Sequence, residues 1–161
     1  MSYFAAALVR FGDGWTAHEV DLDEMETIDD VVDLLRELDG AIGTTLLLVE
    51  EDDEYVAIVR LDADQDDPRV FVSDGRAAET FAVAEMLVDG IAQVPLDPDS
   101  DEPVDHDGDP VGDPDLLLDL GTSPVELRAL CAQERSLPSD VISAVCEKAG
   151  CLDELEALRE G

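Results

Sequence analysis

The feature that most constrains the fold is an uninterrupted apolar run at residues 46–49, inside the segment LLLVEEDDEY (46–55). A strand with one solvent-exposed face alternates apolar and polar residues, whereas an unbroken apolar run is typical of a strand covered on both faces. A second β-rich run, VAIVRLD (56–62), follows an acidic turn at residues 50–54. The sequence therefore predicts a hairpin whose first strand is covered on both sides.

Two more strands are predicted near the start of the chain, at residues 3–11 and 15–21. The Gly12-Asp13-Gly14 cluster between them contains Asp-Gly, which favours a hairpin turn. A helix follows, because residues 28–38 carry apolar side chains at helical spacing. Thr27 stands at its N-cap position, and Asp30, three residues later, takes the place of the reciprocal capping residue.

The last part of this half adds a strand and a helix. DPRVFVSD (67–74) is a predicted strand that begins after Pro68, since proline has no amide to donate to a sheet. Ser73 or Asp74 is a suitable cap for a second helix, whose apolar face holds Ala77, Phe81, Ala84 and Val88. The resulting order, β-β-α-β-β-β-α, predicts an α+β domain at residues 1–92, with a mainly antiparallel sheet and helices packed on it.

Residues 93–113 differ in composition, because they are rich in Asp and Pro and poor in apolar side chains. Such a segment buries too little surface to offset its ordering entropy, so we expect an extended acidic linker. Residues 114–161 then form a helical C-terminal region, with helix starts at Asp113-Pro114, Ser123-Pro124 and Pro138 and a last short helix that carries Leu152, Leu155 and Leu158. Four short helices are too few to be very stable alone, so we expect them to dock on the sheet or on a partner.

The chain carries 42 acidic and 9 basic residues, a formal charge of −33. This charge excludes direct nucleic-acid binding, which depends on Lys and Arg releasing counterions, and it disfavours anionic membranes. The hydrophobic content of 45% is that of a globular chain, so the charge does not predict disorder. Host composition, GC-rich or salt-adapted, explains the acidity almost as well as a basic partner does. With no signal-peptide flanks or membrane-length apolar run, the chain is expected to be soluble and cytoplasmic.

No metal, cofactor or catalytic motif is found in the sequence. Asp105, Asp107 and Asp109 alternate beside Gly108, but either alignment with a calcium loop puts proline at a required position. The cysteines (Cys131, Cys146 and Cys151) and the histidines (His18 and His106) lack the spacing of a zinc site or a triad. We therefore expect no cofactor, no metal site and no catalytic residue, with the cysteines serving as reduced core residues.

Tryptophan and cations are scarce in this chain, which makes a few of them candidates for partner contacts. The candidates are Trp15, Arg69 and Arg76, with the neighbouring Asp74. The warrant is the enrichment of Trp and Arg at protein interfaces. The alternative is that Trp15 lies at the edge of the core and that the arginines form intramolecular ion pairs.

Several strings resemble one known family. They are MSYFAAALVR at the start, Gly14-Trp15, LLLVEEDDEY, DPRVFVSD, the 112–117 segment Gly-Asp-Pro-Asp-Leu-Leu, and the pairs Leu137-Pro138 and Gly150-Cys151. In these the chain is similar to the tRNA adenosine deaminase-associated proteins of actinobacteria, nearly end to end. The resemblance implies a bacterial cytoplasmic protein linked to the tRNA deaminase chiefly by gene neighbourhood, and it implies no particular chemistry.

The chain is not itself the deaminase. A zinc deaminase needs H-x-E and a later P-C-x-x-C, whereas here His18 is followed directly by Glu19 and no two cysteines are two residues apart. The leading hypothesis is a non-enzymatic accessory or regulatory protein that binds a basic partner, with the tRNA-modifying adenosine deaminase as that partner. The alternative is an acidic nucleic-acid mimic that inhibits a basic RNA-binding protein. An unrecognised carboxylate hydrolase is the weakest of the three hypotheses.

Overall fold

The structure is a computed structural model that describes residues 3–11, 14–22, 24–39, 43–51, 55–62, 68–73, 81–93, 111–112, 114–132 and 138–160. Its strands are β1 (Tyr3–Phe11), β2 (Gly14–Glu19), β3 (Thr44–Glu51), β4 (Tyr55–Asp62), β5 (Arg69–Val72) and β6 (Val111–Gly112). Its helices are α1 (Ile28–Asp39), α2 (Ala82–Gln93), the 3₁₀ helix η2 (Pro114–Leu120), α3 (Pro124–Ala132), α4 (Pro138–Ala149) and α5 (Leu152–Glu160).

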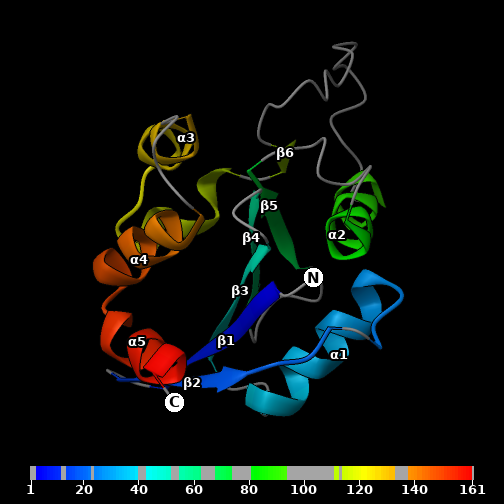
Figure 1. Ribbon diagram of the computed structural model, residues 1–161, viewed down its shortest axis with the longest axis horizontal. Coiled ribbons are helices and arrows are strands. Elements are labelled where there is room, and N and C mark those ends of the chain that lie inside the picture. The colour runs from blue at the N-terminus through cyan, green and yellow to red at the C-terminus, as the bar shows by residue number, and fades with distance from the viewer. Residues whose placement is uncertain are drawn as a thin grey trace.

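The six strands form one antiparallel sheet in the order β2-β1-β3-β4-β5-β6. Helices cover both of its faces: Figure 1 shows α1 and α2 on one side and α3, α4 and α5 on the other. The predicted α+β class, a mainly antiparallel sheet with packed helices, is confirmed. The β1–β2 and β3–β4 pairs are the predicted hairpins, and Phe11 lies opposite Gly14 across the first turn.

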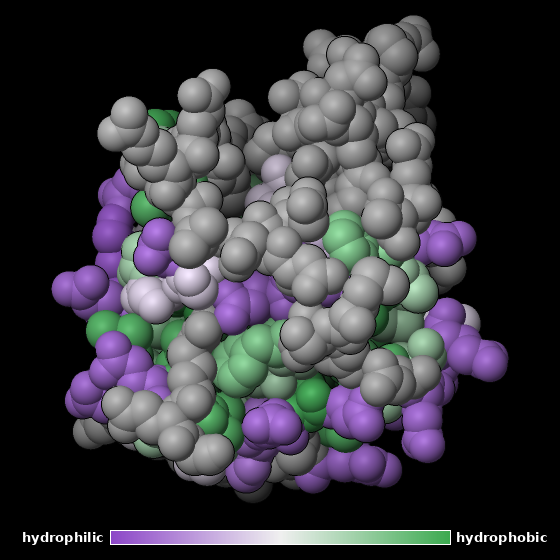
Figure 2. Space-filling model, viewed as in Figure 1, coloured by the Kyte–Doolittle hydropathy of each residue, from purple (hydrophilic) through white to green (hydrophobic). Residues whose placement is uncertain are grey.

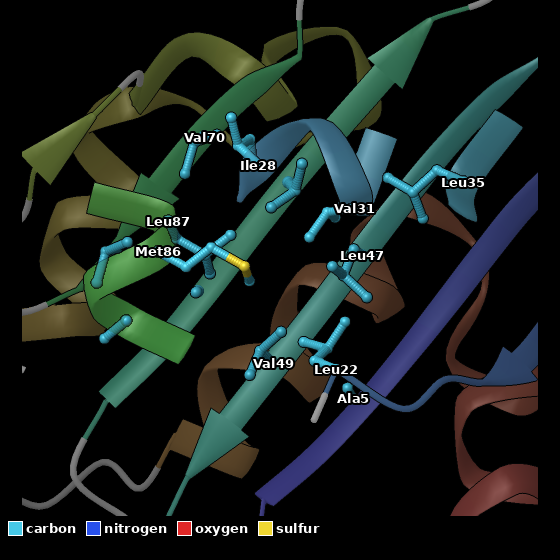
Figure 3. Packing of buried hydrophobic residues seen from close by; sticks show 14 of the residues in the cluster. Ala5, Leu22, Ile28, Val31, Leu35, Leu47, Val49, Val70, Met86 and Leu87 are labelled. Atoms are coloured by element: carbon cyan, nitrogen blue, oxygen red, sulfur yellow. The ribbon is translucent and has the colours of Figure 1, made fainter. Parts of the chain in front are cut away.

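The apolar run in β3 is buried on both sides, as predicted. Leu47 and Val49 point into the core beneath α1 and α2, which also holds Val31, Leu35 and Leu87 (Figure 3). Leu46 and Leu48 point the opposite way, into a second core shared with η2 and helices α3 to α5. The period of two along a strand divides its side chains between the two layers. An antiparallel sheet therefore acquires the continuous apolar strands that are usual in buried parallel sheets.

Helix α1 begins with the predicted cap. The Asp30 carboxylate accepts hydrogen bonds from the amides of Glu26, at 3.0 Å, and Thr27, at 3.2 Å. These bonds satisfy amides that have no partner inside the helix, and they lower the pKa of Asp30 below its usual value. The buried face of α1 then carries Ile28, Val31, Val32 and Leu35. This face orients the helix on the sheet.

The second predicted helix is described from Ala82 onward. The structure begins α2 at Ala82, and residues 74–80, with the predicted face residue Ala77, lie outside the described residues. The Ser73 hydroxyl accepts a hydrogen bond from the Val56 amide at 2.9 Å, and the Ser73 amide donates to the Val56 carbonyl at 2.8 Å. Ser73 therefore extends the pairing of β4 with β5.

The helices of the C-terminal region dock on the sheet. Leu116 and Leu117 of η2, Ile142 of α4 and Leu155 of α5 are fully buried in the second core. The predicted cap of α3 is present, because the Ser123 hydroxyl accepts from the Glu126 amide at 3.2 Å. Gly121 and Gly150 follow η2 and α4 at positive φ, where glycine is unstrained. Of the two docking alternatives, the sheet is the one observed.

Two short segments differ from the sequence prediction. Glu50 and Glu51 extend β3 instead of forming the turn, and Glu51 is buried because its carboxylate accepts a 2.8 Å hydrogen bond from the Tyr55 hydroxyl. Val111 and Gly112, predicted as linker, pair with β5 as β6. Residues 94–110 lie outside the described residues, so the acidic linker and the division at residues 92 and 113 stay predictions.

None of the helices that the structure describes has the length and apolar content needed to cross a membrane.

Candidate interaction surface

The described residues do not gather the groups of a metal site. Among them, no cluster of three or more His, Cys, Asp or Glu side chains could hold a metal ion. His18 is half-buried on β2, whereas Cys146 and Cys151 are buried in the second core and form no disulfide. The Asp105, Asp107 and Asp109 series, with His106, lies outside the described residues, and so does the Cys131 side chain.

Trp15 lies on β2, at one edge of the sheet. It is half-buried and packs against the second core, and the Arg10 guanidinium carbon lies 5.9 Å from its ring centroid. Arg10 is directly opposite Trp15 in the register of β1 and β2. This pair places a cation over the indole face, where the ring quadrupole attracts it. Trp15 is therefore both a core-edge residue and part of an accessible strand.

Arg69 lies far from Trp15. It is on β5, directly opposite Arg60, and β1, β3 and β4 separate it from β2. Four interstrand spacings amount to about 19 Å. Asp74 and Arg76 lie outside the described residues. The structure thus does not bring the two described contact candidates into one site, and a partner contact at any of the four residues stays a proposal.

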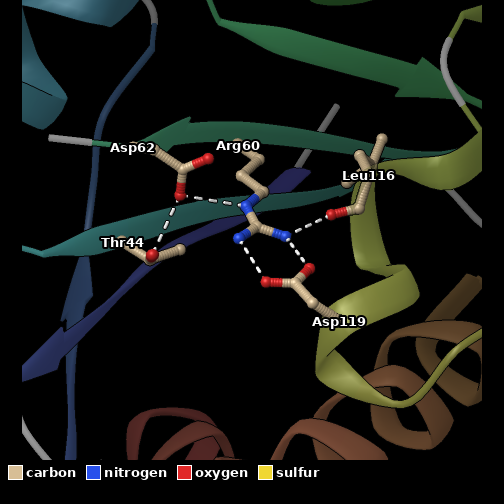
Figure 4. Close-up of polar contacts among 5 residues, drawn as sticks. All are labelled: Thr44, Arg60, Asp62, Leu116 and Asp119. Atoms are coloured by element: carbon tan, nitrogen blue, oxygen red, sulfur yellow. Dashed lines mark hydrogen bonds and ion pairs between the residues drawn. The ribbon is translucent and has the colours of Figure 1, made fainter. Parts of the chain in front are cut away.

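A structural arginine that sequence reasoning missed is Arg60. Arg60 lies on β4 beneath η2, and only 6% of its side chain is exposed. Its Nη1 donates to the Leu116 carbonyl at 2.6 Å and to Asp119 Oδ1, and its Nη2 donates to Asp119 Oδ2 at 2.8 Å. Its Nε donates to Asp62 at 3.1 Å, and Thr44 donates to the same carboxylate at 2.9 Å (Figure 4).

The Arg60 network fastens η2 to the sheet. Hydrogen bonds to Asp119 raise the pKa of Arg60, and the guanidinium lowers the pKa of Asp119 in return. Each nitrogen of Arg60 donates to an acceptor within the chain, so the network serves the architecture of the fold. A signal was present in the sequence: Val56, Ile58 and Arg60 share one face of β4, which places a cation on a buried face.

The two edges of the sheet differ sharply. β6 consists of two residues, and Gly112 has φ of 105°, so this edge is short and irregular. β2 runs for six residues in regular register, and among the described residues it pairs with β1 alone. Proteins usually blunt an exposed edge with proline, lysine, bulges or brevity, and β2 carries no proline and no lysine.

Acidic helices flank the β2 edge. α5 packs across β2 and contains four acidic residues and one arginine, with Asp153 and Glu156 exposed. α1 contains five acidic residues and one arginine, with Asp29, Asp33 and Glu37 exposed. Figure 2 shows hydrophilic residues over the α1 side and over the α4–α5 side of the molecule. We call the β2 edge together with the exposed faces of α1 and α5 the acidic edge.

The fold and this surface define an acidic, three-layered α+β protein whose edge strand β2 pairs on one side only among the described residues. The family of Rv3753c-like tRNA adenosine deaminase-associated proteins matches residues 3–152, and the chain belongs to that family. The match covers all the described strands and the helices from α1 to α4, and it ends at the first residue of α5. The description of the family associates its members with the deaminase and does not call them deaminases. No curated protein and no solved structure matches the chain at a significant level.

Proposed function

We propose that this protein is a non-catalytic accessory or regulatory partner that binds tRNA adenosine deaminase directly. The observation that carries the proposal is the family match over residues 3–152. The acidity of the surface supports it, because an enzyme that binds tRNA presents cationic surface to phosphates and so complements a chain of charge −33. Complementary potentials of this kind raise association rates and suppress wrong partners.

The exposed carboxylates on the helices are the contacts that this function requires. Asp29, Asp33 and Glu37 stand on the solvent side of α1, whose opposite face is buried, so they are available without any change in the core. Charges at the rim of an interface act mainly on the association rate and on its salt dependence. Neutralising them therefore leaves the fold intact while slowing complex formation.

The test is co-purification of the full chain with the deaminase of the same organism at low and at moderate salt. We expect a complex at low salt that weakens as salt rises. A variant in which Asp29, Asp33 and Glu37 become Asn, Asn and Gln should associate more slowly. A matched variant neutralises Glu85, Asp140 and Glu147, which are also exposed but lie on α2 and α4, outside the acidic edge, and it should associate at the unchanged rate. Absence of a complex at both salt concentrations would remove the proposal.

A deamination assay with tRNA separates an accessory role from mimicry of nucleic acid. An accessory partner changes the rate in a way that saturating tRNA does not reverse. A mimic slows the reaction by occupying the tRNA site, so excess tRNA restores the rate. Relief by tRNA would therefore replace the accessory role with the inhibitor.

A further inference from the structure

We infer that the open edge of β2 binds an extended, lysine- and arginine-bearing segment of a partner protein, which adds to the sheet as a further strand. The inference deepens the proposed function, since it names the surface that engages the partner and the chemistry of the partner's segment. The edge itself is defined by the fold, and only the identity of the partner rests on the proposed function.

The register of β1 and β2 identifies the backbone groups that face outward. The Val20 amide donates to the Ala5 carbonyl at 3.1 Å, and these two residues are opposite each other one step beyond Ala6 and Glu19. Hydrogen-bonded and non-hydrogen-bonded pairs alternate along an antiparallel ladder. The amides and carbonyls of Glu19, Ala17 and Trp15 therefore point away from β1, toward the open edge.

These outward groups form a template for strand addition. Three residues at alternate positions offer three N–H donors and three C=O acceptors in a straight row, which is the arrangement that an added strand requires. No hydrogen bond of the described residues occupies the outward amides of Trp15, Ala17 or Glu19. At the opposite edge the described part of the chain offers no such row, because β6 is two residues long.

The charge around the edge determines what kind of segment fits. Glu19 is exposed on β2 itself, and the segment that follows, residues 20–27, contains four acidic residues and no basic one. α5 lies against β2 on one face of the sheet, with Asp153 and Glu156 exposed. The single cation of the hairpin, Arg10, is held over the Trp15 ring. An incoming strand with Lys and Arg side chains meets opposite charge, whereas an acidic strand meets repulsion.

A second copy of this chain is a poor occupant for the same reason. Pairing β2 with β2 of another molecule brings together two chains of charge −33, with their acidic helices beside the seam. Like charges at such an interface cost free energy and slow encounter. The acidity thus takes the place of the missing lysine and proline: it protects the edge from self-association and leaves it open to a basic strand.

The register also supplies a selective variant. Because the Ala17 amide points outward, Ala17→Pro removes a donor from the open edge without removing a hydrogen bond to β1. Ala17→Ser is the matched control, since it keeps the amide and a small side chain. Trp15 is the only tryptophan of the chain and lies two residues away on the same edge. Its fluorescence therefore reports occupancy of the edge directly.

The probe is a terminally blocked peptide of alternating lysine and valine, titrated into the full-length protein at low salt. We expect saturable quenching or shift of the Trp15 emission, with the affinity of Ala17→Pro weaker by about tenfold and that of Ala17→Ser unchanged. A glutamate–valine peptide of the same length should not bind. A lysine–valine peptide methylated on every backbone amide nitrogen keeps its charge but has no N–H to donate along either edge, and it should bind at least as weakly as the unmethylated peptide binds to Ala17→Pro.

The outcomes separate this inference from the proposed function. Equal binding of the methylated and unmethylated peptides would overturn the inference, because the attraction would then be charge alone. A dimer of the unmodified protein in sedimentation that Ala17→Pro dissolves would overturn it too, since the occupant would be a second copy. If the deaminase co-purifies equally well with Ala17→Pro, the function holds and the edge is not its contact. If the peptide binds as expected but no deaminase complex forms, the edge holds and the function fails.

Discussion

Removing the Asp119 carboxylate should loosen η2 from the sheet by a measurable amount. Asp119→Ala deletes two of the four hydrogen bonds that Arg60 donates, both of them charge-assisted. Such bonds contribute about 1.5–3 kcal/mol each when buried. The Asp119 side chain is 63% exposed, however, so solvent screens the pair and water replaces the lost acceptor. We expect a loss of about 1–2 kcal/mol in the free energy of unfolding, or about 2–8 °C in Tm.

Removing the other partner should cost more. Arg60→Met leaves the Leu116 carbonyl beneath η2 without its donor and leaves Asp62, which is 15% exposed, with Thr44 alone. Breaking a buried pair in this way costs about 3–5 kcal/mol. Urea unfolding followed by circular dichroism, at constant m-value, measures both variants and the double mutant. The double-mutant cycle should give a coupling of about 1–2 kcal/mol between Arg60 and Asp119.

The pH dependence of the same pair has a definite sign. The guanidinium lowers the pKa of Asp119 below 3.8, so folding is favoured by its ionised form. The stability that this adds is complete well above pH 3.8 and disappears as the pH falls through the lower folded-state pKa. The difference between the native protein and Asp119→Ala should therefore be constant near neutrality and shrink in acid. A coupling below about 0.3 kcal/mol, or a difference that persists unchanged in acid, would refute the fastening role of this pair.

Three further predictions concern two glycines at positive φ, the cap of α1 and the second core. Gly112→Ala should lower stability by more than Gly150→Ala. Both residues have positive φ, but a Cβ at residue 112 would clash with the backbone carbonyl of Val70, whereas a Cβ at residue 150 meets no atom within 4 Å; thermal unfolding of the two variants decides this. Asp30→Ala should reduce the urea midpoint at pH 7 but have no effect once the pH is below the lowered pKa of Asp30, since protonation already weakens the cap. Ile142→Ala should cost about 2–5 kcal/mol and move the Trp15 fluorescence and helical dichroism transitions together, because both belong to the second core; separate transitions would show that the C-terminal helices unfold independently.

Local signals in the sequence predicted the elements well. The apolar run at residues 46–49 predicted a strand buried on both faces, and the caps at Asp30 and Ser123 marked where helices begin. These features depend on spacing within one turn or one strand, so they can be recognised without knowing the fold. The hairpins followed for the same reason, since their strands are neighbours in the sequence.

Features that join distant segments could not be predicted. The Arg60 network unites residues 44, 60, 62, 116 and 119, and only the docking of η2 over β4 brings them together. β6 exists because Gly112 pairs with Phe71, which two residues of sequence cannot signal. The open edge depends on strand order: β2 is outermost because the chain returns through α1 to place β3 on the far side of β1.

The position of the second core at the end of the chain has a consequence for synthesis on the ribosome. Once Gln93 has been added, the chain contains strands β1 to β5 and helices α1 and α2, which cover one face of the sheet. The residues that cover the other face begin at Pro114. At about 5–20 residues per second, the remaining segment takes on the order of 3–13 s to complete. During that interval Leu8, Leu46 and Ile58 present an uncovered apolar face. Electrostatic repulsion between nascent chains then opposes their aggregation, so the acidity that surrounds this fold also protects it while it is unfinished.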